Sequence, residues 1–349
     1  MTDPRPGLRD VQPYTSPQHH VVARLNTNEC PHPLPEGFGE DLARAVTEIP
    51  LNRYPDGQMT SLRDAAAAHF GHPVAGTWAA NGSNEILAQL LQAYGGAGRK
   101  AVVFEPTYAM HGRIAWLTQT DLVRLRVPAD FRLTDESVSD AVAVAPDVIF
   151  VCSPNNPTGN AQPVDVVERL ASSTEALVIA DEAYAEFGGQ SALPLVADHP
   201  NLVVTRTMSK AFALAGARVG YALASTEVVD DLQRVRLPYH LSALSQAAGL
   251  AAIHRASEAL AILEAIRAER DRLSATLRAM PGMTVYPSDA NFILFVPPAP
   301  ATEVWQALLD RGVLIRDLSS VVPNALRVTA GATHEVDLFL SALPEVLAT

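Results

Sequence analysis

Apolar runs alternate with amphipathic segments along most of the chain, and this alternation predicts an α/β fold. Amphipathic helical patterns occur at 36–48, 61–71 and 85–94. Short runs that are apolar on both faces occur at 101–106, 146–154, 176–183, 201–207 and 218–225. Strands of this kind, separated by helices, are typical of a parallel or mixed sheet that is covered on both faces.

The pattern changes near residue 240. Helical periodicity continues from 242 to 280, which predicts one long helix or two. A strand, a helix, two short strands and a final helix follow, and together they predict a compact α+β unit. The first residues are rich in Pro, His and Asn and predict an extended arm. We therefore expect an N-terminal arm (1–35), a large domain (36–240) and a small C-terminal domain (241–349).

Composition narrows the classes of function. The 349 residues are 48% hydrophobic and 18% charged, which is typical of a globular protein, and the net charge of −12 argues against a nucleic-acid or anionic-membrane partner. The first residues lack the apolar core of a signal peptide, and no later run approaches a membrane span. Cys30 and Cys152 form neither a disulfide framework nor a metal-ligand spacing. We expect a cytoplasmic protein.

Polar clusters follow several of the apolar runs, at the ends where ligands gather in open α/β sheets. In "ANGSNEIL", Ser83 and Asn84 begin a predicted helix, whose free N–H groups favour an anion, although for this motif taken alone an ordinary helix cap is the favoured explanation. In "SPNNPTG", Asn156 precedes a proline, which holds it at a turn with its amide available to a ligand.

Two further clusters contain charged residues. Asp181 ends the run before "DEAY", where its carboxylate requires a cation, a salt bridge or a helix cap, and Tyr184 lies three residues later. In "TRTMSKAFALAGARVGY", Thr207 and Ser209 share one side of an extended chain, and Lys210 is followed by apolar residues up to Arg218. Apolar surroundings lower the pKa of a lysine and favour the neutral amine that attacks a carbonyl, although an isolated lysine often extends to the surface instead.

The four clusters together fit one ligand. Hydroxyls and a guanidinium suit a phosphate, the lysine suits an aldehyde, and the aspartate suits a cationic ring nitrogen. These groups match pyridoxal 5′-phosphate (PLP). The 29 residues from 181 to 210 leave room for a loop, a helical turn and the returning strand.

The motifs "SPNNPTG", "DEAY" and "TMSKAFALAGARVGY" resemble, in this order, those of the fold-type-I, class II PLP-dependent aminotransferases. The segments "LNTNE", "NRYPDG", "PTYAMH", "RLPYHLS", "NFILF" and "LIRD…LRVTAG" are similar to the histidinol-phosphate aminotransferases within that group. The resemblance extends from Pro13 to about Gly331. It implies a large domain, whose mostly parallel seven-stranded sheet lies between helices, and a smaller α+β domain at the C-terminus.

The resemblance also implies roles for matching residues. Lys210 would form the Schiff base with PLP and move protons, and Asp181 would pair with the pyridine nitrogen; with Tyr184 they would be the catalytic residues. Asn156 and Tyr184 would bind the phenolic oxygen, and Tyr108 would stack on the ring. The residues that would bind the cofactor phosphate are Ser83, Asn84, Thr207, Ser209 and Arg218.

The implied reaction transfers the amino group of L-histidinol phosphate to 2-oxoglutarate, giving imidazole acetol phosphate and L-glutamate, in histidine biosynthesis. Tyr14, Asn156, Arg316 and Arg327 would bind the substrates. Tyr54 would reach the cofactor phosphate from a second subunit, which implies a homodimer.

The chain departs from the family pattern at two places, and other functions compete with this interpretation. Cys30 replaces a usual asparagine, and the loop between Arg316 and Arg327 is short. Aromatic amino-acid aminotransferases share nearly all of these motifs, and a threonine-phosphate decarboxylase is a more distant alternative. A PLP-type sensor domain would need a DNA-binding domain that the chain has no room for. Neither "GGAGRK" nor the histidine pair in "HFGH" completes a nucleotide or metal site.

Overall fold

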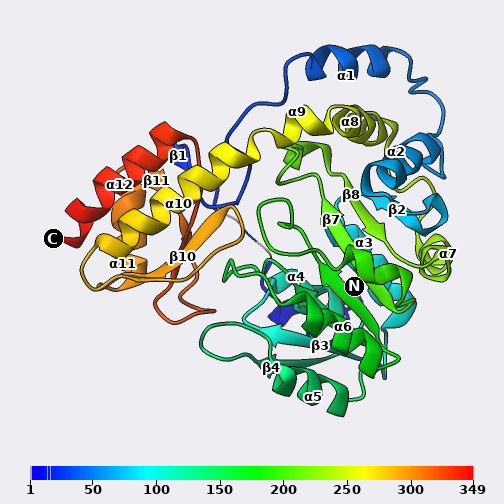
Figure 1. Cartoon of the computed structure of the whole chain (residues 1–349), viewed down its shortest axis with the longest axis horizontal. Coiled ribbons are helices and arrows are strands. Elements are labelled where there is room, and N and C mark those ends of the chain that lie inside the picture. Colours follow the sequence, from blue (N-terminus) through cyan, green and yellow to red (C-terminus); the bar gives the residue numbers. More distant parts are fainter. Residues whose placement is uncertain (1, 14, 16, 349) are drawn as a thin grey trace.

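The computed structural model describes residues 2–13, 15 and 17–348. Figure 1 shows a large unit built around a broad sheet and a smaller unit toward the C-terminus, with the yellow helical region running from one to the other. Side chains from both units can therefore meet where the two units face each other.

Among the described residues, seven strands form the large sheet, in the order β2-β8-β7-β6-β5-β3-β4. β8 is antiparallel to both of its neighbours, and the other pairs are parallel. Every residue of β5, β6 and β7 is buried, as expected for apolar strands with helices on both faces. The predicted mostly parallel sheet is confirmed. Its strands are β2 (Thr77–Ala80), β3 (Lys100–Glu105), β4 (Asp121–Arg126), β5 (Val148–Cys152), β6 (Leu177–Asp181), β7 (Leu202–Thr207) and β8 (Gly220–Leu223).

Helices cover the sheet, and polar side chains cap the N-termini of three of them. The side chains of Thr134, Ser225 and Ser242 accept backbone N–H bonds and cap α5, α7 and α8. α3 begins without a side-chain cap, directly after β2. The helices of this unit are α1 (Phe38–Thr47), α2 (Thr60–Phe70), α3 (Ser83–Tyr94), α4 (Ala109–Leu117), α5 (Asp135–Ala143), α6 (Val164–Ser173), α7 (Thr226–Val235) and α8 (Ala243–His254).

The helical region expected at 242–280 is more divided than predicted. It contains α8, α9 (Ala256–Leu260) and α10 (Leu263–Ala279). Arg255 interrupts it with φ −108° and ψ 23°, and its guanidinium pairs with Asp41 and Glu258. α8 packs against α1 and α2, which favours placing the change of unit after α8. The domain boundaries themselves stay a prediction.

The smaller unit is an antiparallel sheet covered by helices. The expected strand at 313–317 is divided in two, because β11 pairs with β1 while β12 pairs with β13. The stretch predicted as an extended arm therefore contributes β1 to this unit. The elements are β1 (Ala23–Arg24), β9 (Thr284–Val285), β10 (Phe292–Val296), α11 (Ala301–Asp310), β11 (Val313–Leu314), β12 (Arg316–Asp317), β13 (Leu326–Thr329) and α12 (Thr333–Leu347).

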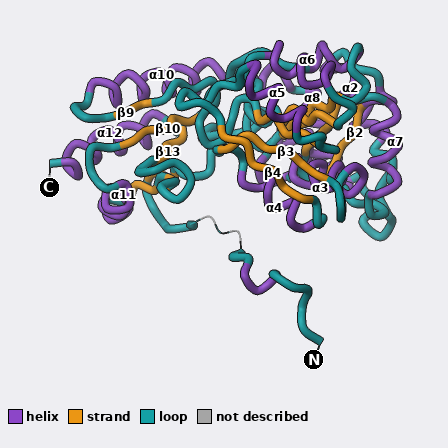
Figure 2. Tube along the Cα trace, turned by 90° about the horizontal axis from the view of Figure 1, so that it is seen from below, coloured by secondary structure: helices purple, strands orange, loops and turns teal. Residues whose placement is uncertain are grey.

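Figure 2 shows the N-terminal segment running outside both units. It contacts α4 through a few polar groups. The guanidinium of Arg5 lies 4.1 Å from the ring centroid of Trp116, and Arg113 donates a hydrogen bond of 2.8 Å to the carbonyl of Gln12.

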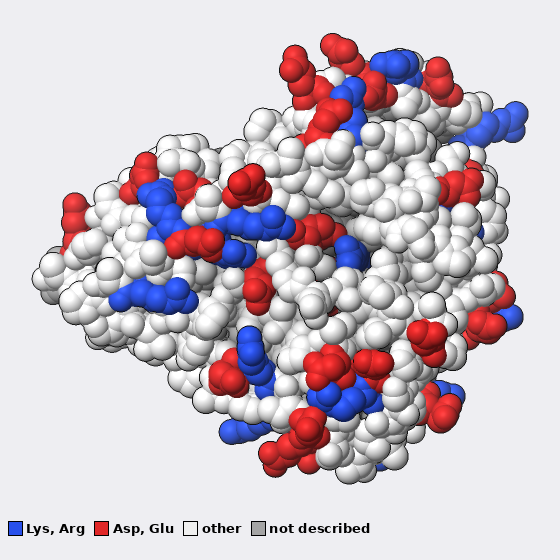
Figure 3. All heavy atoms as spheres, in the orientation of Figure 1, with Lys and Arg blue, Asp and Glu red and all other residues white. Residues whose placement is uncertain are grey.

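Charge on the surface is mixed. On the face drawn in Figure 3, basic and acidic side chains are interspersed, and no broad area carries one sign. In the part of the chain that the structure describes, no helix has both the length and the apolar composition to cross a bilayer.

Candidate functional site

A pocket lies at the carboxyl ends of the parallel strands β5, β6 and β7 and reaches β12 and β13 of the smaller unit. The sheet brings these strand ends together, as expected for an open α/β sheet. The pocket is lined by most of the residues singled out from the sequence: Ser83, Asn84, Tyr108, Asn156, Asp181, Tyr184, Thr207, Ser209, Lys210, Arg218, Arg316 and Arg327.

Among the described residues that the sequence singled out for the site, Tyr54 is not part of this lining. Tyr54 lies at the surface with 79% of its area exposed, and its ring stacks on Tyr239 with centroids 4.3 Å apart. Tyr14 lies outside the described residues.

Lys210 follows β7 and extends into the pocket. Its Nζ donates a hydrogen bond of 2.9 Å to the carbonyl oxygen of Thr27 and lies 5.8 Å from the ring centroid of Tyr184. Burial and the nearby charges of Arg327 and Arg218 lower the pKa of Lys210 to about 8. A substantial fraction of the amine is therefore neutral near pH 8 and able to attack a carbonyl.

Asp181, at the end of β6, is held by two donors. Its Oδ2 lies 3.0 Å from Nε2 of His111, and its Oδ1 accepts a bond of 3.2 Å from the hydroxyl of Thr205. His111 is fully buried and stacks on Phe150. The buried carboxylate is thus fixed in place, which suits an aspartate that must face a cationic ring nitrogen.

Sequence reasoning gave no role to His111. The available signal was its place in "PTYAMH", a polar residue in the first turn after an apolar strand. Its side chain is 0% exposed and faces Asp181, a residue 70 positions away. That pairing depends on the order of the strands and not on the local pattern.

Tyr184 is arranged as a hydrogen-bond donor. Its hydroxyl oxygen accepts bonds from Nδ2 of Asn28 (3.0 Å) and Nδ2 of Asn156 (3.4 Å). The orientation of Asn156 is fixed because its Oδ1 accepts a 2.5 Å bond from Arg327, which can only donate. With both lone-pair positions occupied, the hydroxyl proton is left to point into the pocket. Burial raises the pKa of Tyr184 to about 12, so the proton stays in place at neutral pH.

The sequence interpretation missed Asn28, which also exchanges bonds with Thr329. Its backbone N–H and its Oδ1 both contact the hydroxyl of Thr329, at 3.0 and 3.1 Å. The segment "LNTNE" contributes to the family resemblance but by itself indicates no partner for Asn28. The partners of Asn28 lie 156 and 301 residues away, so no local pattern indicates them.

An anion cradle forms one end of the pocket. α3 begins at Ser83 after Gly82, whose φ of 82° suits glycine, and no side chain caps its first N–H groups. A guanidinium N–H of Arg218 donates 3.1 Å to the hydroxyl of Ser209, which also receives a bond from Thr207. A Cβ on Gly82 would lie 2.4 Å from Arg218. The close approach of backbone, hydroxyls and guanidinium suits a phosphate.

Tyr108 stands between the cradle and the buried carboxylate. Its hydroxyl donates 3.2 Å to Oδ1 of Asn84, and its ring meets the edge of His111 with centroids 5.5 Å apart. A planar ring held at both ends in this way is suited to packing on an aromatic ligand.

Two arginines of the smaller unit line the other end. Arg316 and Arg327 are register partners across β12 and β13. Arg327 is buried, donates to the carbonyl of Asn26 at 3.0 Å, and its guanidinium lies 5.0 Å from the ring centroid of Phe292. Adjacent guanidinium groups favour anionic substituents such as carboxylate or phosphate.

The donor set fits PLP. A phosphate requires N–H and hydroxyl donors, which the cradle at Ser83, Ser209 and Arg218 provides. An aldehyde requires the nucleophilic amine of Lys210, and a ring nitrogen requires the carboxylate of Asp181. All of these groups line one pocket.

Comparison with known proteins gives concordant results. The family described as Aminotransferase class I and II matches residues 21–343. Histidinol-phosphate aminotransferase of Frankia casuarinae is 51% identical, covering 98% of this chain and 90% of the relative, and that of Thermobifida fusca is 50% identical, covering 97% and 94%. The crystal structure of histidinol-phosphate aminotransferase from Sinorhizobium meliloti in complex with pyridoxal-5′-phosphate superposes with a TM-score of 0.85 at 25% identity, covering 94% of this chain and 91% of that one.

Proposed function

Since this chain belongs to the class I and II aminotransferases, and within them to the histidinol-phosphate aminotransferases, we propose that it transfers the amino group of L-histidinol phosphate to 2-oxoglutarate. The products are imidazole acetol phosphate and L-glutamate, and the reaction belongs to histidine biosynthesis. The main support for the proposal is that Lys210, Asp181 and the anion cradle line the same pocket. Identity of about half over nearly the whole chain favours this substrate over the aromatic amino acids.

PLP, when bound, supplies the electron sink that makes transamination possible. Ser83, Asn84, Thr207, Ser209 and Arg218 would hold its phosphate, and Tyr108 would pack on its ring. These assignments are supported by the uncapped start of α3 and by the bonds among Thr207, Ser209 and Arg218.

The chain's own catalytic groups have separate tasks. Lys210 would bind the cofactor and would accept and return a proton at Nζ, which its pKa of about 8 allows near neutral pH. Asp181, held by His111 and Thr205, would stabilise a positive charge on the ring nitrogen. Tyr184 and Asn156 would donate to an oxygen that carries negative charge.

Substrate would be bound from the smaller unit. Arg316 and Arg327 would take the anionic groups of the two substrates, together with Asn156 and Tyr14. The register pairing of the two arginines supports a shared anion site for phosphate and carboxylate.

The working form would be a homodimer in which Tyr54 reaches the cofactor phosphate of the other subunit. An apolar surface supports this proposal: the segments 51–54 and 237–244 expose several large apolar side chains, and Tyr54 stacks on Tyr239 between them. Exposed apolar groups gathered on neighbouring segments mark interaction sites. We name this surface the Tyr54 patch; its members are Leu51, Tyr54, Leu237, Tyr239 and Leu244. A cytoplasmic location stays a prediction from the sequence.

The test is a steady-state comparison of amino donors with the PLP-loaded protein. L-histidinol phosphate should give a kcat/KM at least about 100-fold above those of phenylalanine and tyrosine. Its phosphate offers the two guanidinium groups three acceptor oxygens and more negative charge than the α-carboxylate of an amino acid, and one extra charge-assisted hydrogen bond is worth about 1.5–3 kcal/mol. Lys210→Ala is the matched control and should abolish transamination. A preference for the aromatic amino acids would contradict the proposed substrate.

A further inference from the structure

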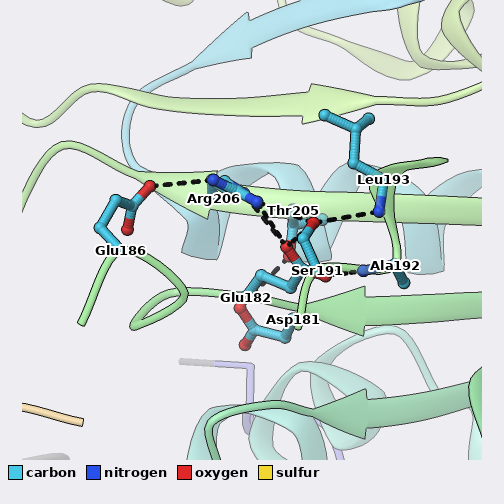
Figure 4. Close-up of polar contacts among 8 residues, drawn as sticks. All are labelled: Asp181, Glu182, Glu186, Ser191, Ala192, Leu193, Thr205 and Arg206. Carbon is cyan, nitrogen blue, oxygen red and sulfur yellow. Dashed lines mark hydrogen bonds and ion pairs between the residues drawn. The ribbon is translucent and has the colours of Figure 1, made fainter. Parts of the chain in front are cut away.

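A buried charged cluster lies behind the pocket, at the start of the loop that carries Tyr184. Figure 4 shows Arg206 between Glu186 and Glu182, with Ser191 beside them. Arg206 donates to Oε2 of Glu182 at 2.8 and 3.2 Å, to Oε1 of Glu186 at 3.2 Å and to the hydroxyl of Ser191 at 2.8 Å. All three charged side chains are at least nine-tenths buried. The mechanism above uses none of them.

The cluster lies on the opposite face of the strands from the pocket. Asp181 is the register partner of Thr205 and binds its hydroxyl, and Thr207 lines the pocket. Because successive side chains of a strand point to opposite faces, Arg206 faces away from the pocket. Its guanidinium packs against the ring of Phe70, 5.5 Å from the centroid.

Glu182 closes the loop that runs from 182 to 192. Its Oε1 accepts a 2.6 Å bond from the N–H of Ala192, and its Oε2 accepts a 2.7 Å bond from Ser191, so one carboxylate joins both ends of the loop. The backbone carbonyl of Glu182 also accepts from Ala185, which makes the turn that contains Tyr184.

The same loop is held from the smaller unit. Arg267, on α10, donates 2.6 and 2.8 Å bonds to the carbonyls of Glu186 and Phe187. Phe187 donates its N–H to the carbonyl of Tyr184 at 3.0 Å. The turn is therefore fixed on both sides of the tyrosine, and the position of its hydroxyl depends on these contacts.

Stability alone does not account for the cluster. Burying two carboxylates and a guanidinium carries a large desolvation cost, and apolar replacements of similar volume often leave stability unchanged or raise it. An apolar replacement makes no directional hydrogen bonds. Arg206, in contrast, donates to three acceptors in a fixed geometry. The ion cluster is suited to fixing a loop in one position.

We propose that Glu182 and Arg206 are positioning residues, which hold the 182–192 loop so that the hydroxyl proton of Tyr184 points at the cofactor's phenolic oxygen. The inference rests on the proposed function, because it requires PLP bound at Lys210. It adds to that function a buried cluster that acts on the cofactor only through Tyr184.

The test follows the visible absorbance of the PLP-loaded protein as a function of pH. A donor to the phenolic oxygen stabilises its anionic form, so Tyr184→Phe should raise the pH midpoint of the absorbance change by about one unit. A charge-free variant, Glu182→Met with Glu186→Gln and Arg206→Met, should raise the midpoint by about half a unit or more. Thermal unfolding should show that this variant remains folded.

The direction of the shift separates positioning from electrostatics. The charge-free variant removes two carboxylates and one guanidinium, so the surroundings of the cofactor become less negative, or stay unchanged if Glu186 is protonated. Burial raises the pKa of Glu186, while its ion pair with Arg206 lowers it. A loss of negative charge would lower the midpoint. Only displacement of the Tyr184 donor raises it.

Three comparisons decide the outcome. Arg206→Lys keeps the positive charge but loses the planar set of guanidinium donors that reaches three acceptors at once. It should therefore also raise the midpoint. Adding either the charge-free substitutions or Arg206→Lys to Tyr184→Phe should give no further rise in the midpoint, because the Tyr184 hydroxyl is already absent. Arg169→Met, which breaks an exposed ion pair with Asp165, should leave the midpoint unchanged.

An unchanged midpoint in both cluster variants, a further rise in the Tyr184→Phe background, or an equal rise in Arg169→Met would overturn the inference. Failure of the proposed function looks different: the wild-type protein would then form no lysine-bound PLP absorbance at all.

Discussion

At the scale of single residues, Lys210 shows how burial prepares a reactive group. Its amine lies in a pocket where desolvation and two arginines disfavour the charged form, and it donates a hydrogen bond to the carbonyl of Thr27. An ordinary lysine with a pKa near 10.5 would be almost entirely charged at neutral pH.

The lowered pKa predicts how cofactor capture depends on pH. Only the neutral amine attacks the aldehyde, so the rate at which cofactor-free protein captures PLP should rise with pH, with a midpoint near 8 instead of 10.5. The rate is measured from the growth of visible absorbance after mixing. Nα-acetyl-lysine under the same conditions is the control, and a protein midpoint at or above 10 would contradict the prediction.

At the scale of elements, the start of α3 and the strand β8 meet so closely that glycine is required. A Cβ on Gly220 would lie 2.3 Å from the backbone nitrogen of Ser83, and Gly82 has a left-handed φ of 82° beside Arg218. The anion cradle is therefore a product of two elements that approach each other without side chains between them.

Gly82→Ala should displace Arg218 and weaken PLP binding. We expect the Kd for PLP to rise by about tenfold to about 100-fold, the effect of losing a charge-assisted hydrogen bond to phosphate, while the fold is retained. Equilibrium titration of visible absorbance measures the Kd, and circular dichroism checks the fold. Gly216→Ala is a matched control because its Cβ would meet no atom within 4 Å. Equal affinity for PLP in wild type and Gly82→Ala would refute the assignment of the cradle.

At the scale of the whole molecule, the Tyr54 patch determines the expected assembly. Leu237 is 75% exposed, and burying a leucine of this kind at an interface contributes about 1.5–3 kcal/mol. Leu237→Asp would place a charge there, so we expect the dissociation constant of the dimer to rise more than tenfold, with PLP affinity falling as Tyr54 withdraws.

Sedimentation analysis at several protein concentrations would measure this change. Val22→Asp is a suitable control, since Val22 is 72% exposed but lies outside the Tyr54 patch. A monomer in the wild type, or an unchanged dimer in Leu237→Asp, would count against the proposed assembly.

The sequence determined those features that a local pattern can carry. Apolar runs predicted the strands of the large sheet because burial on both faces leaves a continuous apolar signature. The polar residues at their ends predicted one ligand site, because parallel strands bring their carboxyl ends to one edge. The division of 242–280 into α8, α9 and α10 was not predicted, since the interruption at Arg255 depends on its ion pair with Asp41, 214 residues away.

Only the tertiary structure decided which side chains face each other. His111 meets Asp181 across 70 residues, Asn28 meets Tyr184 across 156, and Arg327 orients Asn156 across 171. Periodicity constrains which face of an element is buried, but strand order and register constrain which distant residues touch, and these are set by packing of the whole chain. The sequence alone was therefore sufficient to predict a PLP lysine, while the contacts that orient its neighbours depend on the tertiary structure.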